Sequence, residues 1–456
     1  MFKSKKSRES SAEPKAESKA ESKESSAAPS IPDTTQIPDS PEPADPELQE
    51  DQKKTSGMFK ILAKLIGVKD LINLRLSLPT QYLDPVSNLE YWGYMEHPDY
   101  FIRIPDNDDP VERIINTARW WIVKDSKFLN KKLSKPFNSV LGEQFFCKWL
   151  VEKKISTSPS ESREVSPASD NSSYRSVSQT STGATPDSYQ VEYITEQVSH
   201  HPPVSAYSYR CEEKKIEAVG LDHISARFAS LSVIISPGSW NKGIFLTLGT
   251  RDNETYNCTH SNGQVVGWLT NKLKAISIGT IRITCPKTKL ACILDFAEKN
   301  WYGKIKDIVE GVVFTYDPEN SDIQDWTSKT IPSNITPIAK IKGQWDGKTF
   351  VEYTSKPESE PILLVDMHTA KPGKKIVKPI EEQGENESRK VWGKVMEKMV
   401  QRDYTNATKL KIELEEYQRT LATERVNSAQ EFIPALFVKD FDDGKPKLLD
   451  DAKINI

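Results

Sequence analysis

The stretch Ile276-Ser-Ile-Gly-Thr-Ile-Arg-Ile283 alternates between apolar side chains and small or polar ones. Val204-Ser-Ala-Tyr-Ser-Tyr209 and Gly243-Ile-Phe-Leu-Thr-Leu248 alternate in a similar way. A two-residue period is typical of a β-strand that buries one face. Strand signals of this kind continue from Gln190 to Val365 with few helical patterns between them. This region therefore predicts a large antiparallel sheet.

Two residue pairs within this region have the composition of a tight hairpin turn. Asn262-Gly263 lies between the predicted strands 254–259 and 265–269, and Asp346-Gly347 lies between 338–345 and 349–353. Asn-Gly and Asp-Gly pairs favour the two-residue turns that join antiparallel strands. A sheet of so many strands has to curl, split or close to protect its edges. We expect a mostly β fold of the α+β class, a large curled antiparallel β-barrel with an interior cavity rather than a sandwich.

Helical periodicity flanks the strand region on both sides. Residues 110–133 predict a helix with Pro110 in its first turn. Residues 388–403 and 406–427 predict two more, with Ser388 and Asn406 as their N-caps. In the last helix one apolar stripe is expected to pack against the sheet, and it consists of Leu410, Leu414, Tyr417 and Leu421.

The N-terminal part differs in composition from the rest of the chain. Residues 1–57 are rich in Ser, Lys, Glu and Pro and predict a disordered tail. Residues 58–76 begin with an amphipathic pattern in which Phe59, Leu62 and Ile66 are apolar and lysines lie between them. Such a segment could form a lid or a membrane-surface helix, and a surface helix docked on the core is the alternative.

One folded domain is expected to follow. Residues 77–386 form its barrel, interrupted by a Ser/Thr/Pro-rich insertion at 156–188 that predicts a disordered loop. Residues 387–456 form a C-terminal helical part of the same domain. We expect a monomer.

Charge and cysteine usage narrow the function classes. The net charge of −3 argues against a nucleic-acid binder. Five scattered cysteines and an N-terminus without an apolar core segment predict a cytosolic protein with reduced thiols. No run approaches the ~18 apolar residues that span a bilayer, so membrane contact is expected to be peripheral.

Three clusters of residues are candidates for a binding site. They are Lys135-Pro-Phe-Asn-Ser-Val-Leu-Gly-Glu143, Glu196-Gln-Val-Ser-His-His-Pro-Pro-Val-Ser205, and Lys411-Ile-Glu-Leu-Glu-Glu-Tyr-Gln-Arg419. The N–H groups of imidazole rings and of the Lys and Arg cations donate hydrogen bonds to phosphate oxygens. In the third cluster Lys411, Glu415 and Arg419 recur every four residues, so they share one helical face.

Plainer interpretations remain open from the residues alone. The adjacent His200 and His201 could be structural or could bind a metal, although no further Cys or His ligand at suitable spacing is visible nearby. The histidines could also act as a general base, but the sequence has no GxSxG motif that would supply a serine nucleophile. The Lys411–Arg419 face is typical of a solvated ladder of ion pairs. No metal site and no cofactor are predicted.

The three clusters, in this order, closely resemble elements of the oxysterol-binding protein family. The phrase Glu196-Gln-Val-Ser-His-His-Pro-Pro is the most specific, and the resemblance extends from about Leu71 to Phe437. It implies a near-closed barrel around a lipid tunnel with an N-terminal lid, in a short soluble member of fungal type. Ser139 departs from the family, which usually has proline there, so the loop is expected to be less rigid.

The resemblance also implies which residues hold a ligand. The headgroup of phosphatidylinositol 4-phosphate is expected to bind residues of all three clusters, with the histidine pair on the 4-phosphate. These residues are Lys135, Asn138, His200, His201, Lys411, Glu415 and Arg419.

The resemblance implies a lipid carrier and not an enzyme. The leading hypothesis is exchange of a sterol for phosphatidylinositol 4-phosphate between membranes, with peripheral association to the endoplasmic reticulum, Golgi or plasma membrane. Two alternatives are exchange of phosphatidylserine for phosphatidylinositol 4-phosphate by the same fold, and a lipid-responsive signalling scaffold. The sequence does not decide the second lipid.

Overall fold

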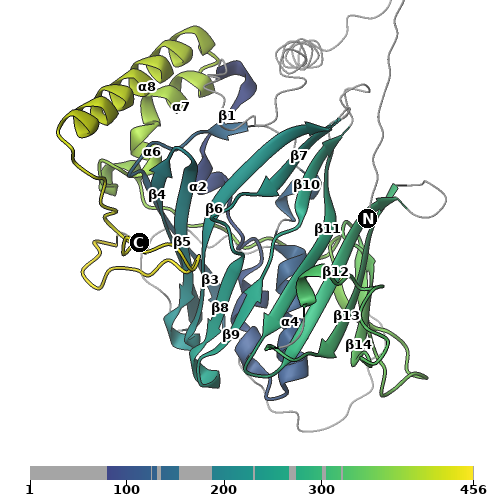
Figure 1. Ribbon diagram of the computed structural model, residues 1–456. Helices are drawn as coiled ribbons and strands as arrows, with labels where there is room; N and C mark the ends of the chain where they lie inside the picture. Colours follow the sequence, from purple (N-terminus) through teal and green to yellow (C-terminus); the bar gives the residue numbers. More distant parts are fainter. Residues whose placement is uncertain are drawn as a thin grey trace, which may run out of the picture. The chain divides into compact units, whose positions relative to one another are not determined.

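The predicted strand region forms one large antiparallel sheet of fourteen strands, which curls around a core (Figure 1). Neighbouring strands pair in the order β16-β15-β14-β13-β12-β11-β10-β7-β6-β5-β4-β3, and β8 and β9 bridge β6 and β11. In chain order the strands of this sheet are β3 (Gln144–Glu152), β4 (Ser188–His200), β5 (Pro203–Cys211), β6 (Ile216–Ala229), β7 (Ser232–Pro237), β8 (Ile244–Leu248), β9 (Glu254–Cys258), β10 (Asn262–Val266), β11 (Lys274–Cys285), β12 (Leu290–Lys299), β13 (Ile305–Thr315), β14 (Ala339–Gln344), β15 (Lys348–Tyr353) and β16 (Ile362–Asp366).

This computed structural model describes residues 80–124, 126–130, 135–153, 187–229, 232–266, 274–299, 305–319, 322–454 and 456. The predicted tail 1–57, the segment 58–76 and nearly all of the insertion 156–188 lie outside these residues. Ser188, the last residue assigned to the insertion, is the first residue of β4. Across the described ranges, no helix has the length and hydropathy needed to cross a membrane.

The helices are short except for two. In chain order they are α2 (Asn88–Tyr91), α3 (Pro98–Ile102), α4 (Pro110–Val123), α5 (Lys127–Asn130), α6 (Ser388–Val391), α7 (Gly393–Val400) and α8 (Tyr404–Asn427). Helix α4 packs inside the curl against β11, β12 and β16, and its buried side chains include Ile114, Ala118 and Trp120. These side chains and the inner faces of the strands form one hydrophobic core. The sheet is therefore curled around α4, and β3 and β16 are its edge strands.

The C-terminal segment covers part of the outer face of the sheet. Leu436 and Phe437 pack against apolar side chains of β3 to β6, including Ile194 and Val204. This explains why β5 is buried on both faces, although its sequence alternates like a strand with one exposed face.

A smaller layer lies at one end of the sheet. Strand β1 (Leu83–Ser87) pairs in parallel with β2 (Lys135–Phe137), and helices α6 and α7 contact β1 (Figure 1). The rings of Phe137 and Trp392 stack at 4.5 Å between centroids in the core of this layer. The layer fixes the positions of β2 and α8, which carry two of the three candidate clusters.

One predicted hairpin is confirmed and the other is wrong. Strands β14 and β15 pair across a turn that contains Asp346-Gly347, as predicted. Asn262-Gly263 instead begins strand β10, which pairs with β7 and β11 and not with β9. Gly263 lies opposite Ile235 of β7. Pairing with strands distant in sequence has therefore overridden the local preference of Asn-Gly for a turn.

The predicted helix boundaries also need correction. Helix α4 ends at Val123 rather than continuing to residue 133. The N-cap of α8 is Asp403, whose carboxylate accepts a hydrogen bond from the backbone N–H of Asn406, so the helix begins at Tyr404. Ser388 is the first residue of α6 and not its cap.

The prediction that the apolar stripe of α8 packs against the large sheet is wrong. Leu410 and Leu414 pack on the small layer around Trp392. Tyr417 is 58% exposed, so the stripe does not continue as a packed face. The second half of α8 is largely exposed.

Candidate functional site

The first cluster forms β2 and the loop that follows it. Pro136 and Phe137 are buried, whereas the side chains of Lys135 and Asn138 are exposed. Lys135 Nζ donates a hydrogen bond to Asn138 Oδ1 at 2.7 Å. Because Phe137 anchors the strand, the polar ends of Lys135 and Asn138 are held on the same side of the loop.

The end of this cluster is fixed by the buried carboxylate of Glu143. Its Oε2 accepts hydrogen bonds from the backbone N–H of Val140 at 2.9 Å and from Trp392 Nε1 at 3.0 Å. Its Oε1 accepts from the hydroxyl of Ser388 at 2.7 Å and from that of Ser87. One side chain therefore joins β1, the β2–β3 loop, α6 and the residue that follows α6.

The second cluster lies directly beside the first. The backbone N–H of Gly142 donates to the carbonyl of Gln197 at 2.9 Å, and that of Gln197 donates to the carbonyl of Glu143 at 2.8 Å. The buried carboxylate of Glu196 accepts from the backbone N–H groups of Ala435 and Leu436, both at 2.8 Å. The residues before the histidine pair are thus structural, and they fix where β4 ends.

His200 is the last residue of β4 and His201 follows in the turn before β5. Their rings contact each other edge to face, with centroids 4.8 Å apart. Both side chains are exposed. The turn therefore presents two imidazoles together at the end of the strand.

The third cluster lies on α8. Lys411 is 4% exposed, and its Nζ contacts Glu415 Oε1 at 2.6 Å. Arg419 lies one turn further along, and its side chain is exposed. Among the residues that the structure describes, Arg419 forms no ion pair. Of the three charged residues of this helical cluster, Lys411 and Glu415 are therefore the two that contact each other.

Electrostatic effects show that the three clusters meet. The pKa of Lys135 is lowered to about 8, mainly by burial and also by the nearby charge of Lys411, whereas the charge of Glu415 acts to raise it. Burial also lowers the pKa of His200, as do the charges of His201 and Arg425, whereas a hydrogen bond to the backbone of Ser139 and the charge of Glu415 raise it. Segments almost 300 residues apart in sequence therefore face one another.

The cluster is partly enclosed by the protein. Lys135 and His200 have exposed side chains, and yet burial is the largest influence on the pKa of each. This cluster of Lys135, His200, Lys411 and Glu415 is called the recess below. Cations that are partly removed from water are poorly hydrated, which favours an anionic ligand.

Two further residues lie near this cluster. Ser139, which departs from the family's usual proline, is buried, and its hydroxyl lies 3.1 Å from that of Ser87. Arg425, which none of the three sequence clusters includes, lies in the last turn of α8, and its charge is among those that lower the pKa of His200. Phe59, Leu62 and Ile66 lie outside the described residues.

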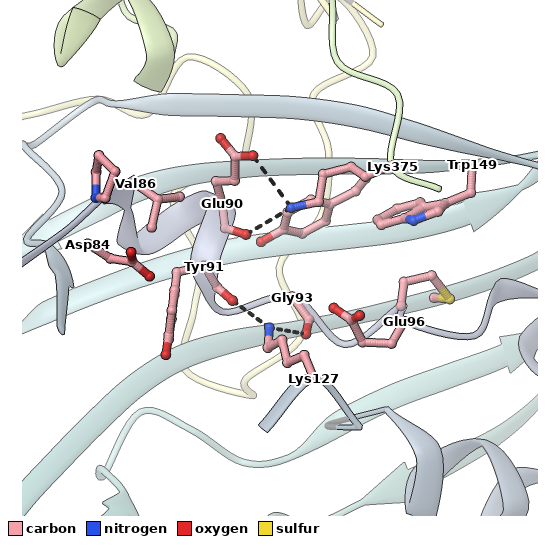
Figure 2. Close-up of a pocket in the computed structure, with 12 residues that line it drawn as sticks. Asp84, Val86, Glu90, Tyr91, Gly93, Glu96, Lys127, Trp149 and Lys375 are labelled. Carbon is pink, nitrogen blue, oxygen red and sulfur yellow. Dashed lines mark hydrogen bonds and ion pairs between the residues drawn. The ribbon is translucent and has the colours of Figure 1, made fainter. Parts of the chain in front are cut away.

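A second concavity lies next to β1. It has a volume of about 260 Å³, and its walls include Trp149 and Tyr193. Figure 2 shows that its cations are engaged by the protein: Lys375 contacts Glu90, and Lys127 donates to the carbonyls of Tyr91 and Gly93. Glu90 also accepts a bidentate pair of hydrogen bonds from Arg389 at 2.9 and 2.7 Å. This pocket is therefore a weaker candidate for an anionic ligand than the recess.

Comparison with known proteins identifies the family. A sequence profile described as oxysterol-binding protein matches residues 57–401. The oxysterol-binding protein-like protein 1 of Schizosaccharomyces pombe is 35% identical, over 89% of this chain and 91% of the relative. The Osh1 ORD domain solved with cholesterol has a similar fold, with a TM-score of 0.59 and 19% identity over 87% of each chain. The Osh3 ORD of Saccharomyces cerevisiae solved with PI(4)P has a TM-score of 0.56 and 16% identity, over 86% of this chain and 89% of that one. The chain belongs to the oxysterol-binding protein family.

Proposed function

We propose that this protein carries lipids between membranes, exchanging a sterol for phosphatidylinositol 4-phosphate. The observation that carries the proposal is the meeting of Lys135, His200 and Lys411 in one recess, with Glu415 between the cations. A phosphate monoester has about two negative charges and three acceptor oxygens, so it suits such a recess. Asn138, His201 and Arg419 are proposed to complete the headgroup contacts.

The acyl chains need an apolar space beside this recess. Every residue of β10 is half-buried, and most of β7 is too. A strand that packed one face on a solid core would bury every second residue, as β8 does by alternating between buried and half-buried positions. The half-buried strands support a hollow in this part of the curled sheet. Such a space is needed because each CH₂ group transferred to water costs about 0.8 kcal/mol.

A polar cluster inside the core favours a sterol as the second lipid. Among the described residues, the buried polar atoms without a hydrogen-bond partner include Tyr207 Oη, His260 Nε2 and Trp121 Nε1. The ring of His260 lies 5.4 Å from that of Trp121 and 5.3 Å from that of Tyr94, which lies 5.6 Å from Tyr207. One hydroxyl can donate to one such group and accept from another, whereas a charged headgroup would need many more partners.

An exchange assay tests the function. Donor vesicles contain a fluorescent sterol, and acceptor vesicles contain phosphatidylinositol 4-phosphate. We expect sterol to move one way and the phosphoinositide to move back, because the two lipids compete for one tunnel. Transfer of phosphatidylserine in place of sterol would select the alternative exchanger. Binding without any transfer would contradict the proposal and favour a lipid-responsive scaffold.

The segment 58–76 is proposed to close the tunnel, with Phe59, Leu62 and Ile66 facing the lipid. The described chain begins at Thr80, which hydrogen-bonds to Thr408 and to the carbonyl of Tyr404 on α8. The described chain therefore begins beside the helix that carries Lys411. Deleting residues 58–68 should speed the loss of bound sterol to empty vesicles, and an unchanged rate would contradict a lid.

The charge of Lys135 should make headgroup binding depend on pH. With its pKa lowered to about 8, the empty site loses this cation as the pH rises from 7 to 9. Affinity for phosphatidylinositol 4-phosphate should therefore fall over that range. Lys135→Arg keeps its charge, because guanidinium titrates well above this range, and should bind with little pH dependence. Equal pH profiles for the two proteins would contradict a role for the Lys135 charge.

A further inference from the structure

The carboxylate of Glu196 connects the C-terminal segment to the strand that carries the histidine pair. We propose that Glu196 is a positioning residue for the phosphoinositide. It holds residues 432–437, called the C-terminal strap below, against the ends of the β2–β3 loop and of β4, so that the groups on both can meet one phosphate. This inference rests on the proposed function and adds to it a support on the outer face of the sheet.

Both oxygens of Glu196 are bound by the C-terminal strap. Oε1 accepts a hydrogen bond from the backbone N–H of Ala435, and Oε2 accepts one from that of Leu436, both at 2.8 Å. Glu196 is fully buried, and a buried carboxylate is costly unless hydrogen bonds satisfy it. An apolar side chain would be enough to cover the sheet, whereas a carboxylate also fixes where the strap lies along β4.

The C-terminal strap covers an irregular point of β4 that lies just before the histidine pair. The pairing of β4 with β5 shifts in register between Gln197 and Ser199, which leaves Val198 as an extra residue. Such a bulge bends a strand and re-aims the side chains beside it. Val198 is buried in one apolar cluster with Leu436 of the strap. The strap therefore supports the backbone that sets the direction of the two imidazoles.

The same strap contacts the loop of the first cluster. A Cβ added at Gly142 would lie 3.2 Å from Cε2 of Phe432, so this ring packs closely on the glycine. Gly142 has a φ of +80°, which favours glycine, and its backbone N–H donates to the carbonyl of Gln197 at 2.9 Å. The strap thus touches both backbone segments of the recess at the point where they are hydrogen-bonded to each other.

Loosening the strap should therefore affect the phosphate site before it affects the fold. Groups that converge on one ligand have to be held to within about 0.5 Å of their productive positions. The apolar contacts of Leu436 and Phe437 remain when Glu196 is changed, so the strap stays attached but can shift. The simpler alternative is that the strap only covers apolar surface. Loosening it would then lower stability and weaken all ligands alike.

The first test variant is Glu196→Gln. Its amide oxygen can accept from one backbone N–H, but its NH₂ group faces the other N–H as a second donor. We expect extraction of phosphatidylinositol 4-phosphate from vesicles to fall about tenfold, as for the loss of one charge-assisted hydrogen bond to the phosphate. Binding of a fluorescent sterol should be retained, which shows that the variant folds.

The matched control is Ile323→Ala. Ile323 packs on apolar side chains of β12 and β13, which are not neighbours of β4 in the sheet. The substitution removes buried apolar contacts and should lower the urea midpoint without changing phosphoinositide extraction. An equal loss of extraction in this control would mean that stability alone is being measured, and would overturn the inference.

Two further results separate positioning from stability. Phe432→Ala should also weaken extraction, and combining it with Glu196→Gln should add little, because both act through one strap. The NMR signals of the His200 and His201 rings should shift in Glu196→Gln and stay constant in Ile323→Ala. Fully additive losses, unshifted histidine signals or wild-type extraction by Glu196→Gln would each overturn this inference. A wild-type protein that extracts no phosphoinositide would overturn the proposed function itself.

Discussion

Replacing His200 and His201 together with alanine is expected to reduce extraction of phosphatidylinositol 4-phosphate by about 100-fold or more. Each imidazole can supply one hydrogen bond to a phosphate, and charge-assisted bonds contribute roughly 1.5–3 kcal/mol each. The two rings lie 4.8 Å apart at the end of β4, so one phosphate can contact both. Their side chains are exposed, so their loss should leave the fold intact.

The double variant needs two comparisons. His368→Ala removes another exposed histidine, which lies two residues after the end of β16. This variant should extract phosphoinositide as wild type does. Binding of a fluorescent sterol should be retained by the double variant, because the histidines are proposed to contact the headgroup alone. Undiminished phosphoinositide extraction would place the headgroup elsewhere.

Glu143→Ala is expected to lower the free energy of unfolding by about 3–5 kcal/mol. The substitution removes the acceptor of four buried donors: Val140 N, Trp392 Nε1 and the hydroxyls of Ser87 and Ser388. The two hydroxyls keep a second partner, Ser139 Oγ and the carbonyl of Gln144, whereas Val140 N and Trp392 Nε1 are left unsatisfied. Unsatisfied buried polar groups are costly because water cannot replace the lost partner. Urea unfolding at pH 7 measures the loss.

Glu143→Gln is the matched control because its amide can satisfy the same site. Its oxygen can accept from Val140 N and Trp392 Nε1, while its NH₂ group donates to the two serine hydroxyls, which can rotate to accept. It should therefore destabilise far less than alanine. Equal losses for the two variants would contradict the assignment of Glu143 as the residue that joins the small layer to the sheet.

The large sheet and the order of the three clusters could be predicted from the sequence. Alternating stretches such as 243–248 and 276–283 are local patterns, and both form strands. The hairpin at Asp346-Gly347 is local too, and it forms. The error at Asn262-Gly263 arose because β10 pairs with β7, a strand almost thirty residues earlier, which no local propensity encodes.

The residues that carry the chemistry of the site were predictable from the sequence, but the buried residues that hold them in position were not. Lys135, His200 and Lys411 carry recognisable chemistry, and the structure brings them together. Glu143 and Glu196 belong to the same motifs, but they bind backbone and side-chain donors from distant segments, so their roles emerge only in three dimensions.

The most direct test is a crystal structure of the protein with phosphatidylinositol 4-phosphate bound. We predict that the 4-phosphate lies between the imidazoles of His200 and His201 and the cations of Lys135, Lys411 and Arg419, with the acyl chains inside the curled sheet. A headgroup bound outside this recess, for example in the pocket beside β1, would contradict the account.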